Sequence, residues 1–321
     1  MIAWVGIGIF SMNKVPVDAV PDITNNQVQV ITVSPNLGTE DIEQFVTYPV
    51  ELAMANLPNV IEIRSISRFG LSVVTIVFED DMGTYLPRQL VSEKLASVKG
   101  EIPPKFGEPF IGPISTGLGE IYQYTLQVDE EHKDQYTSTD LRTYQDWIVK
   151  RQMAMLQGVV EVNSFGGNVK QYEIAVEPNK LKSMSVTITD IFRAVEANNE
   201  NTGGAYIVKN HKANFIKGEG LLTSLDDIKN TVVKTINGKP ILVRDVALVQ
   251  YGRAIRYGLV SRNGIEAVGG AILMLKGENS EDVILRVKER IIEINKSLPK
   301  GIHIEPFLDR ADLIQRTTST V

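Results

Sequence analysis

The sequence predicts an α+β protein with two ferredoxin-like, split-βαβ subdomains, the second of them interrupted by a small inserted α+β subdomain. The first observation is the order of elements. Residues 39–110 run helix, strand, strand and helix before a proline-rich strand entry, and residues 139–166 together with 266–308 follow the same order. A repeat of this size defines an architecture more tightly than any single motif does.

The second observation is that the two copies share short stretches of sequence. Residues 57–63 (LPNVIEI) resemble residues 156–162 (LQGVVEV), and residues 102–105 (IPPK) resemble residues 298–301 (LPKG). Both matches fall where a helix gives way to a strand. We therefore expect two related sheets, each with its two helices on one face.

Residues 1–26 are predicted to be the end of a transmembrane helix and a connector. Met1 to Phe10 is almost wholly apolar, but it is about half of the roughly 20 residues that a membrane helix needs. The first basic residue, Lys14, follows the apolar run, which is not the order of a signal peptide. We expect a truncated transmembrane helix followed by a stiff stretch containing Pro16 and Pro21. A buried N-terminal strand or helix is the alternative.

The first subdomain is predicted over residues 27–118. Gln27–Val33 alternates polar and apolar residues, as a half-buried strand does. A helix begins at Thr39 as its N-cap, and Pro49 predicts a kink within it. Strands follow at Val60–Ser67 and Leu71–Phe78, and then comes a helix that the prolines after residue 102 end.

The second subdomain is predicted to be discontinuous, over residues 119–172 and 265–312. Its first strand covers residues 121–126, and its first helix begins near Ser138 or Thr139. Ser280 is expected to cap its last helix, whose apolar residues recur at helical spacing up to Leu298.

The insertion, residues 173–264, is predicted to be a separate small subdomain with an exposed arm. A helix at Thr189–Asn198 carries Ile191, Phe192 and Val195 as its apolar stripe. Residues 205–208 and 213–217 are short strand-like pieces joined by Lys209-Asn210-His211-Lys212. Such a hairpin is a liability unless its edges pair with something.

The composition excludes several classes of protein. The chain has 321 residues, a net charge of −6 and no cysteine. A nucleic-acid-binding function needs a basic face, and disulfide or thiolate metal sites need cysteine. The three histidines, His132, His211 and His303, stand apart, and no nucleophile–base pair can be assembled. We therefore predict no catalytic, cofactor-binding or metal-binding residue and no enzymatic activity.

The order of several motifs is similar to that of resistance-nodulation-division (RND) transporters. Residues 16–22 (PVDAVPD) resemble the exit of the first transmembrane helix in that superfamily, and residues 46–51 (VTYPVE) resemble its first porter helix. Residues 68–72 (RFGLS) and 77–80 (VFED) resemble its heavy-metal efflux branch, the Cus/Czc-type cation pumps. Further matches continue to the end of the chain, at residues 141–147, 242–247 and 307–314.

The resemblance implies a division of the chain into named parts. Residues 27–118 correspond to a first porter subdomain, and residues 119–172 plus 265–312 to a second. The insertion corresponds to a docking subdomain, and residues 313–321 to the approach to the second transmembrane helix. The docking hairpin, which reaches into a neighbouring protomer of a homotrimer, would include Gly203, Gly204, Tyr206, His211 and Phe215.

The resemblance also implies a function. The whole pump would be a proton-driven antiporter of the bacterial inner membrane, with this region mostly in the periplasm. It would export metal cations through a periplasmic adaptor and an outer-membrane channel. The proton-relay and metal-site residues of the family match no position here, so we expect a fragment that does not transport by itself. Two alternatives remain open: a fragment of a drug- or hydrophobe-exporting RND pump, and a soluble binding protein of two ferredoxin-like domains.

Overall fold

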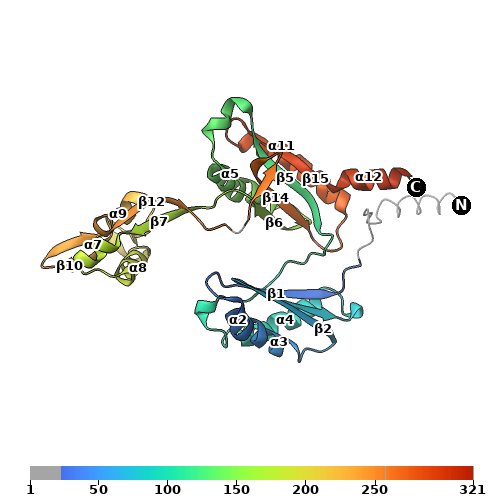
Figure 1. Ribbon diagram of the computed structural model, residues 1–321, viewed down its shortest axis with the longest axis horizontal. Coiled ribbons are helices and arrows are strands. Elements are labelled where there is room, and N and C mark those ends of the chain that lie inside the picture. The colour runs from blue at the N-terminus through green and yellow to red at the C-terminus, as the bar shows by residue number, and fades with distance from the viewer. Residues whose placement is uncertain (1–22, 257, 321) are drawn as a thin grey trace. The chain divides into compact units, whose positions relative to one another are not determined.

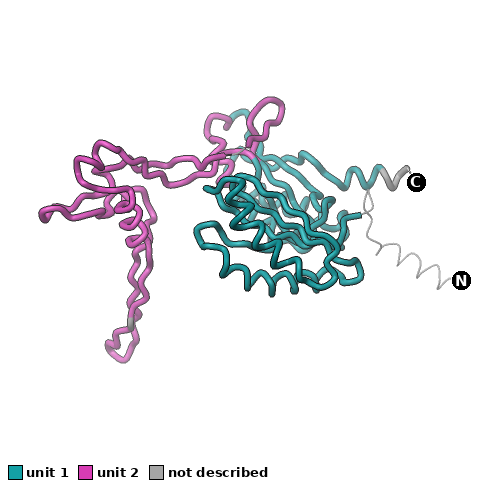
Figure 2. Tube along the Cα trace, turned by 60° about the horizontal axis from the view of Figure 1, so that its bottom comes forward, with its two compact units in different colours: residues 1–131, 145–165, 269–321 teal, residues 132–144, 166–268 magenta. Residues whose placement is uncertain are grey.

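The computed structural model describes residues 23–256 and 258–320 (Figure 1). The chain divides into two compact units, each of which is drawn in its own colour in Figure 2. The first unit contains Met1–Glu131, Gln145–Phe165 and Gly269–Val321, and the second contains His132–Tyr144 and Gly166–Val268. The predicted apolar segment, residues 1–10, lies outside the described residues.

The first sheet has four strands in the order β2-β3-β1-β4, and every neighbouring pair is antiparallel. Helices α3 and α4 pack against it and against each other, as Figure 1 shows. Its elements are β1 (Gln27–Val33), α2 (Thr39–Ile42), α3 (Tyr48–Met54), β2 (Val60–Arg68), β3 (Leu71–Phe78), α4 (Tyr85–Val98) and β4 (Phe110–Ile111).

The core of the first sheet comes from alternate residues on its helix-facing side. Val28 and Val30 of β1 are buried opposite Ile76 and Val74 of β3. Apolar residues of the helices close this core, because they recur at the spacing that places them on one side of a helix. The helical contribution is Ile42, Val46, Val50, Met54, Val91, Leu95 and Val98.

The first helix differs from the prediction at two points. Gly38 occupies the N-cap position and Thr39 is already helical, so the prediction of Thr39 as a cap is wrong. At the place where a kink at Pro49 was expected, the helix contains a π-helical turn, η1 (Glu43–Thr47), directly before Tyr48-Pro49. Proline has no backbone N–H to donate, so the regular hydrogen-bond ladder is interrupted next to it.

The second sheet repeats the strand order of the first. Its strands lie in the order β6-β14-β5-β15. A short strand, β13 (Val260–Arg262), pairs with the first residues of β14, before the part of β14 that pairs with β6. Since β5, β6, β14 and β15 occupy the places of β1, β2, β3 and β4, the predicted ferredoxin-like fold is confirmed. The elements are β5 (Glu120–Val128), α5 (Ser138–Tyr144), the π-helical turn η5 (Gln145–Val149), α6 (Lys150–Met153), β6 (Val159–Phe165), β14 (Ile265–Met274), α11 (Ser280–Ser297) and β15 (Ile302–Asp309).

A polar group lies inside the second sheet's core. Gln145, the first residue of η5, is fully buried, and its Nε2 donates to the hydroxyl of Tyr124 at 3.0 Å. Burial raises the pKa of the Tyr124 phenol well above its ordinary value. Gly270 of β14 lies against both side chains, and any Cβ there would meet the Tyr124 hydroxyl at 2.6 Å. The glycine therefore makes room for a buried hydrogen bond.

The last cap of the second subdomain also differs from the prediction. Asn279, not Ser280, is the N-cap of α11, and its side chain accepts from the backbone N–H of Glu281 at 2.9 Å. Ser280 is instead a buried residue of the first turn. After β15 the chain continues into α12 (Arg310–Thr320). None of the helices in residues 23–256 and 258–320 is both long and apolar enough to cross a membrane.

The second unit is assembled from small elements around a two-stranded ribbon of β7 and β12. Two neighbouring clusters of buried residues share Ile174 and Val176, which lie on the same face of β7, so both clusters pack against one strand. The elements are β7 (Lys170–Val176), α7 (Pro178–Ser183), α8 (Ile188–Ala197), β8 (Thr202–Lys209), β9 (Lys212–Gly218), α9 (Leu225–Lys229), β10 (Val232–Ile236), β11 (Lys239–Leu242), α10 (Val243–Val246) and β12 (Ala247–Arg253).

Candidate functional site

The predicted hairpin arm is formed by β8 and β9, which pair with each other in a sheet of two strands. Figure 2 shows it projecting from the rest of its unit. An isolated two-stranded hairpin is only marginally stable in water. Its open edges and side chains are therefore available to a partner.

The tip of the hairpin is a two-residue turn. Asn210 and His211 have φ values of 54° and 61°, and both lie in the left-handed region. A type I′ turn needs positive φ at both central positions, and asparagine tolerates this better than most residues do. His211 is thus at the tip between Lys209 and Lys212, which face each other across the strands.

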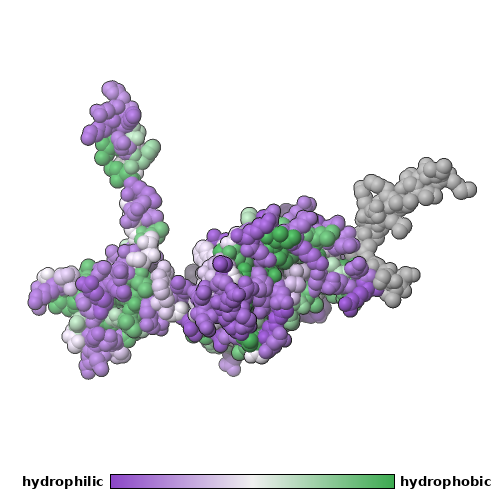
Figure 3. All heavy atoms as spheres, turned by 90° about the horizontal axis from the view of Figure 1, so that it is seen from above, coloured by the Kyte–Doolittle hydropathy of each residue, from purple (hydrophilic) through white to green (hydrophobic). Residues whose placement is uncertain are grey.

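Apolar side chains cover the middle of the arm. Tyr206 lies opposite Phe215 in the register, and their ring centroids are 6.3 Å apart. Tyr206 is 60% exposed and Phe215 84% exposed, and Ile207 and Val208 are exposed beside them. Figure 3 shows a hydrophobic patch along the arm below a hydrophilic tip. Since neighbouring strand residues point to opposite faces, both faces of the arm are apolar.

The base of the arm holds the two predicted glycines. Gly203 lies opposite Lys217, and Gly204 lies at the register shift that follows. A Cβ at Gly204 would come within 2.4 Å of the Ile216 carbonyl oxygen, so only glycine allows the two strands to approach there. Gly203, Gly204, Tyr206, His211 and Phe215 thus lie on one hairpin.

Side-chain amides fix the arm to its unit. Asn201 accepts from the backbone N–H of Gly220 at 3.1 Å, and Asn199 accepts from that of Leu222 at 3.0 Å. Both asparagines belong to the polar segment that follows α8. These hydrogen bonds hold the base of the arm in a fixed position on its unit.

An apolar groove of about 410 Å³ lies beside this base, between β7 and α8. Phe192 was predicted to lie on the apolar stripe of its helix, but its side chain is 68% exposed at the groove. Ile191, one residue earlier, is the one that faces the core. No sequence signal separates the two, because adjacent apolar residues leave the rotation of a helix undecided. The groove is lined mainly by Ile174, Val176, Ile188, Phe192 and Val195.

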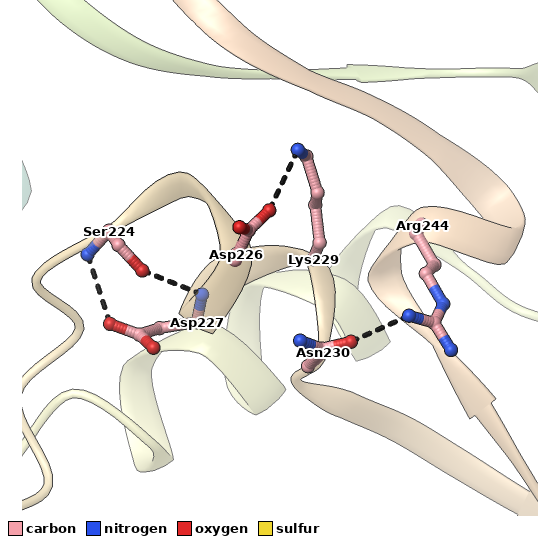
Figure 4. Close-up of polar contacts among 6 residues, drawn as sticks. All are labelled: Ser224, Asp226, Asp227, Lys229, Asn230 and Arg244. Atoms are coloured by element: carbon pink, nitrogen blue, oxygen red, sulfur yellow. Dashed lines mark hydrogen bonds and ion pairs between the residues drawn. The ribbon is translucent and has the colours of Figure 1, made fainter.

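Capping boxes begin two helices of the second unit, α8 beside the groove and α9. Thr187 caps α8 in a capping box with Asp190, and Ser224 caps α9 in the same way with Asp227. Figure 4 shows the second box: the N–H of Ser224 donates to Asp227 Oδ2 at 3.0 Å, and the N–H of Asp227 donates to Ser224 Oγ at 3.1 Å. Hydrogen bonds from the backbone of Thr223, and then from Ser224 and Thr223 side chains, lower the pKa of Asp227.

The end of α9 is held by polar contacts. Lys229 pairs with Asp226 at 2.9 Å, and Arg244 Nη1 donates to Asn230 Oδ1 at 2.7 Å (Figure 4). The first contact lies within α9, and the second is an exposed hydrogen bond that links α10 to the end of α9.

The other histidines do not join the hairpin or form a metal centre. His303 of β15 lies 3.2 Å from Asp129, and His132 belongs to a short 3₁₀ helix at Glu130–Gln135. Among residues 23–256 and 258–320, no group of three or more His, Asp or Glu side chains could hold a metal ion.

Curated relatives match the chain along nearly its whole length. It is 43% identical over 320 residues to "Cation efflux system protein CzcA" of Alcaligenes sp. (strain CT14) and to "Cobalt-zinc-cadmium resistance protein CzcA" of Cupriavidus metallidurans. It is 36% identical over 311 residues to "Cation efflux system protein CusA" of Escherichia coli K12. The alignments with the CzcA proteins cover 98% of this chain and 30% of each relative, so the chain spans less than a third of their length.

A solved structure and a family model agree with these relatives. The crystal structure of a heavy metal efflux pump, crystal form II, superposes with a TM-score of 0.89 at 31% identity, covering 98% of this chain and 31% of that one. The model of the AcrB/AcrD/AcrF family matches residues 1–321. The chain therefore belongs to the AcrB/AcrD/AcrF family of RND transporters, and it corresponds to part of a heavy-metal efflux member.

Proposed function

We propose that this chain supplies the periplasmic porter and docking parts of a proton-driven, inner-membrane pump that exports heavy-metal cations. The names of the relatives, which specify cation efflux and cobalt-zinc-cadmium resistance, support this assignment. The chain acts as a transporter component and not as an enzyme. It spans less than a third of those relatives, so the transport step involves parts of the pump beyond these residues.

The observation that carries the proposal is the pair of sheets with identical strand order, β2-β3-β1-β4 and β6-β14-β5-β15. We assign residues 27–118 to the first porter subdomain and residues 119–172 with 265–312 to the second. Two small sheet-and-helix layers joined by a short crossover can move against each other as rigid bodies. Such a movement would open and close access for a cation.

The inserted subdomain, residues 173–264, has the task of docking. Its hairpin exposes Tyr206 and Phe215 on a narrow two-stranded arm, which is an unfavourable arrangement in water. Burial of these rings in a neighbouring protomer of a homotrimer removes that cost. The assembled pump would then engage a periplasmic adaptor and an outer-membrane channel.

The assembly claim can be tested in the full-length reading frame. Deletion of Gly203–Gly218 is expected to reduce the yield of crosslinked trimer, because the apolar arm is lost. The double variant Tyr206→Ser, Phe215→Ser should reduce it as well, whereas Lys217→Ala, on the same strand as Phe215, should not. A wild-type trimer yield from both the deletion and the double variant would refute the docking assignment.

The transport claim has its own test. Cells that express the full-length protein should tolerate higher concentrations of cobalt, zinc, cadmium, copper or silver salts than cells without it. The metal with the largest change identifies the exported cation. No change for any of these metals, at normal protein abundance, would overturn the proposed function.

A further inference from the structure

A buried arginine lies where the second sheet passes into its last helix. Arg310 is the first residue of α12, yet it is only 8% exposed. Its Nη1 donates a hydrogen bond to the carbonyl oxygen of Leu118, 192 residues earlier in the chain. Leu118 belongs to the crossover, residues 112–119, which joins the last strand of the first sheet to the first strand of the second.

The crossover is also fastened to the second sheet by its backbone. The N–H of Met274 donates to the Gly119 carbonyl at 2.7 Å, and the N–H of Lys276 donates to the Ile114 carbonyl at 3.1 Å. Met274 is the last residue of β14, and Lys276 follows two residues later. Hydrogen bonds thus connect the crossover both to the end of β14 and to the start of α12.

Asp309, the residue before Arg310, also holds the start of α12 in place. Asp309 Oδ1 accepts from the backbone N–H of Ala311 at 3.0 Å, and its Oδ2 pairs with Lys288 Nζ of α11 at 2.5 Å. Tyr122 of β5 lies opposite Asp309 in the ladder. Burial, and then the charges of Asp309 and Asp312, raise the pKa of Tyr122 to about 12, so its phenol stays neutral.

We propose that Arg310 is a positioning residue that couples helix α12 to the crossover between the two sheets. A buried guanidinium that moves away from the Leu118 carbonyl loses a charge-assisted hydrogen bond. Separation of the two segments is therefore unfavourable, and a shift of α12 carries the crossover with it. The inference rests on the proposed function, in which movement of the two subdomains changes access for the cation.

A local measurement on this chain tests the coupling directly. In Arg310→Met, backbone amides of the crossover, such as Gly119, and of the first turns of α12 should exchange with solvent at least about tenfold faster. Amides of β14 before Met274, and those of α11, should keep their rates. Arg310→Lys retains the charge but not the fork of donors, and it should give an intermediate rate. Lys296→Met, an exposed change on α11, is the control and should change none of these rates.

Two outcomes would overturn the coupling. Equal acceleration of all amides would mean that Arg310 stabilises the fold as a whole. An unchanged rate in the crossover would mean that the hydrogen bond to Leu118 transmits nothing.

The consequence for transport is measured in the full-length pump at matched protein abundance. Arg310→Met should lower metal tolerance while the yield of crosslinked trimer stays at the wild-type level, and Arg310→Lys should restore part of the tolerance. If the wild-type pump confers tolerance and Arg310→Met confers as much, the coupling is wrong and the proposed function stands. If the wild-type pump confers none, the proposed function itself fails, and the exchange experiment still decides whether the coupling exists.

Discussion

Substitution of Gly270 by alanine should destabilise the second sheet through its buried polar pair. The added Cβ would lie 2.6 Å from the Tyr124 hydroxyl oxygen and 2.7 Å from Gln145 Nε2. Both distances are far shorter than real carbon contacts, and both side chains are fully buried. At least one of them must move, which breaks the 3.0 Å hydrogen bond between them.

The expected cost combines two effects. Overpacking a filled core typically costs about 1–3 kcal/mol. A buried group that loses its hydrogen-bond partner costs about 1–3 kcal/mol more. Gln145 Nε2 retains a second contact, 3.3 Å from Ser164 Oγ, which offsets part of the loss. We therefore expect Gly270→Ala to lower the free energy of unfolding by about 3 kcal/mol.

Urea unfolding followed by tryptophan fluorescence measures this cost. The chain has two tryptophans, and Trp147 lies in η5, two residues after Gln145. A Trp4→Phe background leaves Trp147 as the only reporter, so the signal comes from the second sheet and its helices. Gly258→Ala is the matched control, because a Cβ there meets no atom within 4 Å.

A double-mutant cycle separates the proposed cause from a general effect of alanine on the strand. Tyr124→Phe removes the hydroxyl that the new Cβ would strike, so Gly270→Ala should cost at least about 1 kcal/mol less in that background. Free-energy changes that simply add, or a Gly270→Ala variant as stable as the control, would refute the reasoning.

Two further predictions concern the helix caps of the second unit. Thr187→Ala removes the side chain that accepts from the Asp190 N–H, and it should lower stability by about 1 kcal/mol in urea unfolding, whereas Thr189→Ala inside the helix should have a smaller effect. The pKa of Asp227 is lowered in the folded state, so its stabilising contribution is present above its unfolded pKa and is lost as the pH falls through the lower folded value. Asp227→Asn should therefore weaken the acid dependence of the unfolding midpoint, and a pH profile identical to the wild type would contradict this.

Sequence alone predicted the repeated architecture well, since its signals are local. Apolar residues at periods of two and of three to four identify strands and helices, and prolines and glycines mark their ends. The hairpin was predictable for the same reason: a polar, glycine-rich base and an Asn210-His211 tip separate two short apolar strands. The hairpin that carries the candidate docking residues is therefore encoded in the local sequence.

Local signals were insufficient where two arrangements share one pattern. Thr39 and Ser280 both suit an N-cap, but Gly38 and Asn279 hold those positions, because the cap is set by where the chain enters its helix. Phe192 fits a buried stripe as well as Ile191 does. The choice between them depends on how the helix is rotated against β7.

The sequence by itself determined the order of the elements, the repeat and the hairpin, because each depends on residues close together in the chain. Only the tertiary structure decided which distant groups meet. Gln145 contacts Tyr124 across 21 residues, and Arg310 contacts Leu118 across 192. No periodicity encodes such pairs, since they arise when sheets and helices pack and most buried polar groups find a partner.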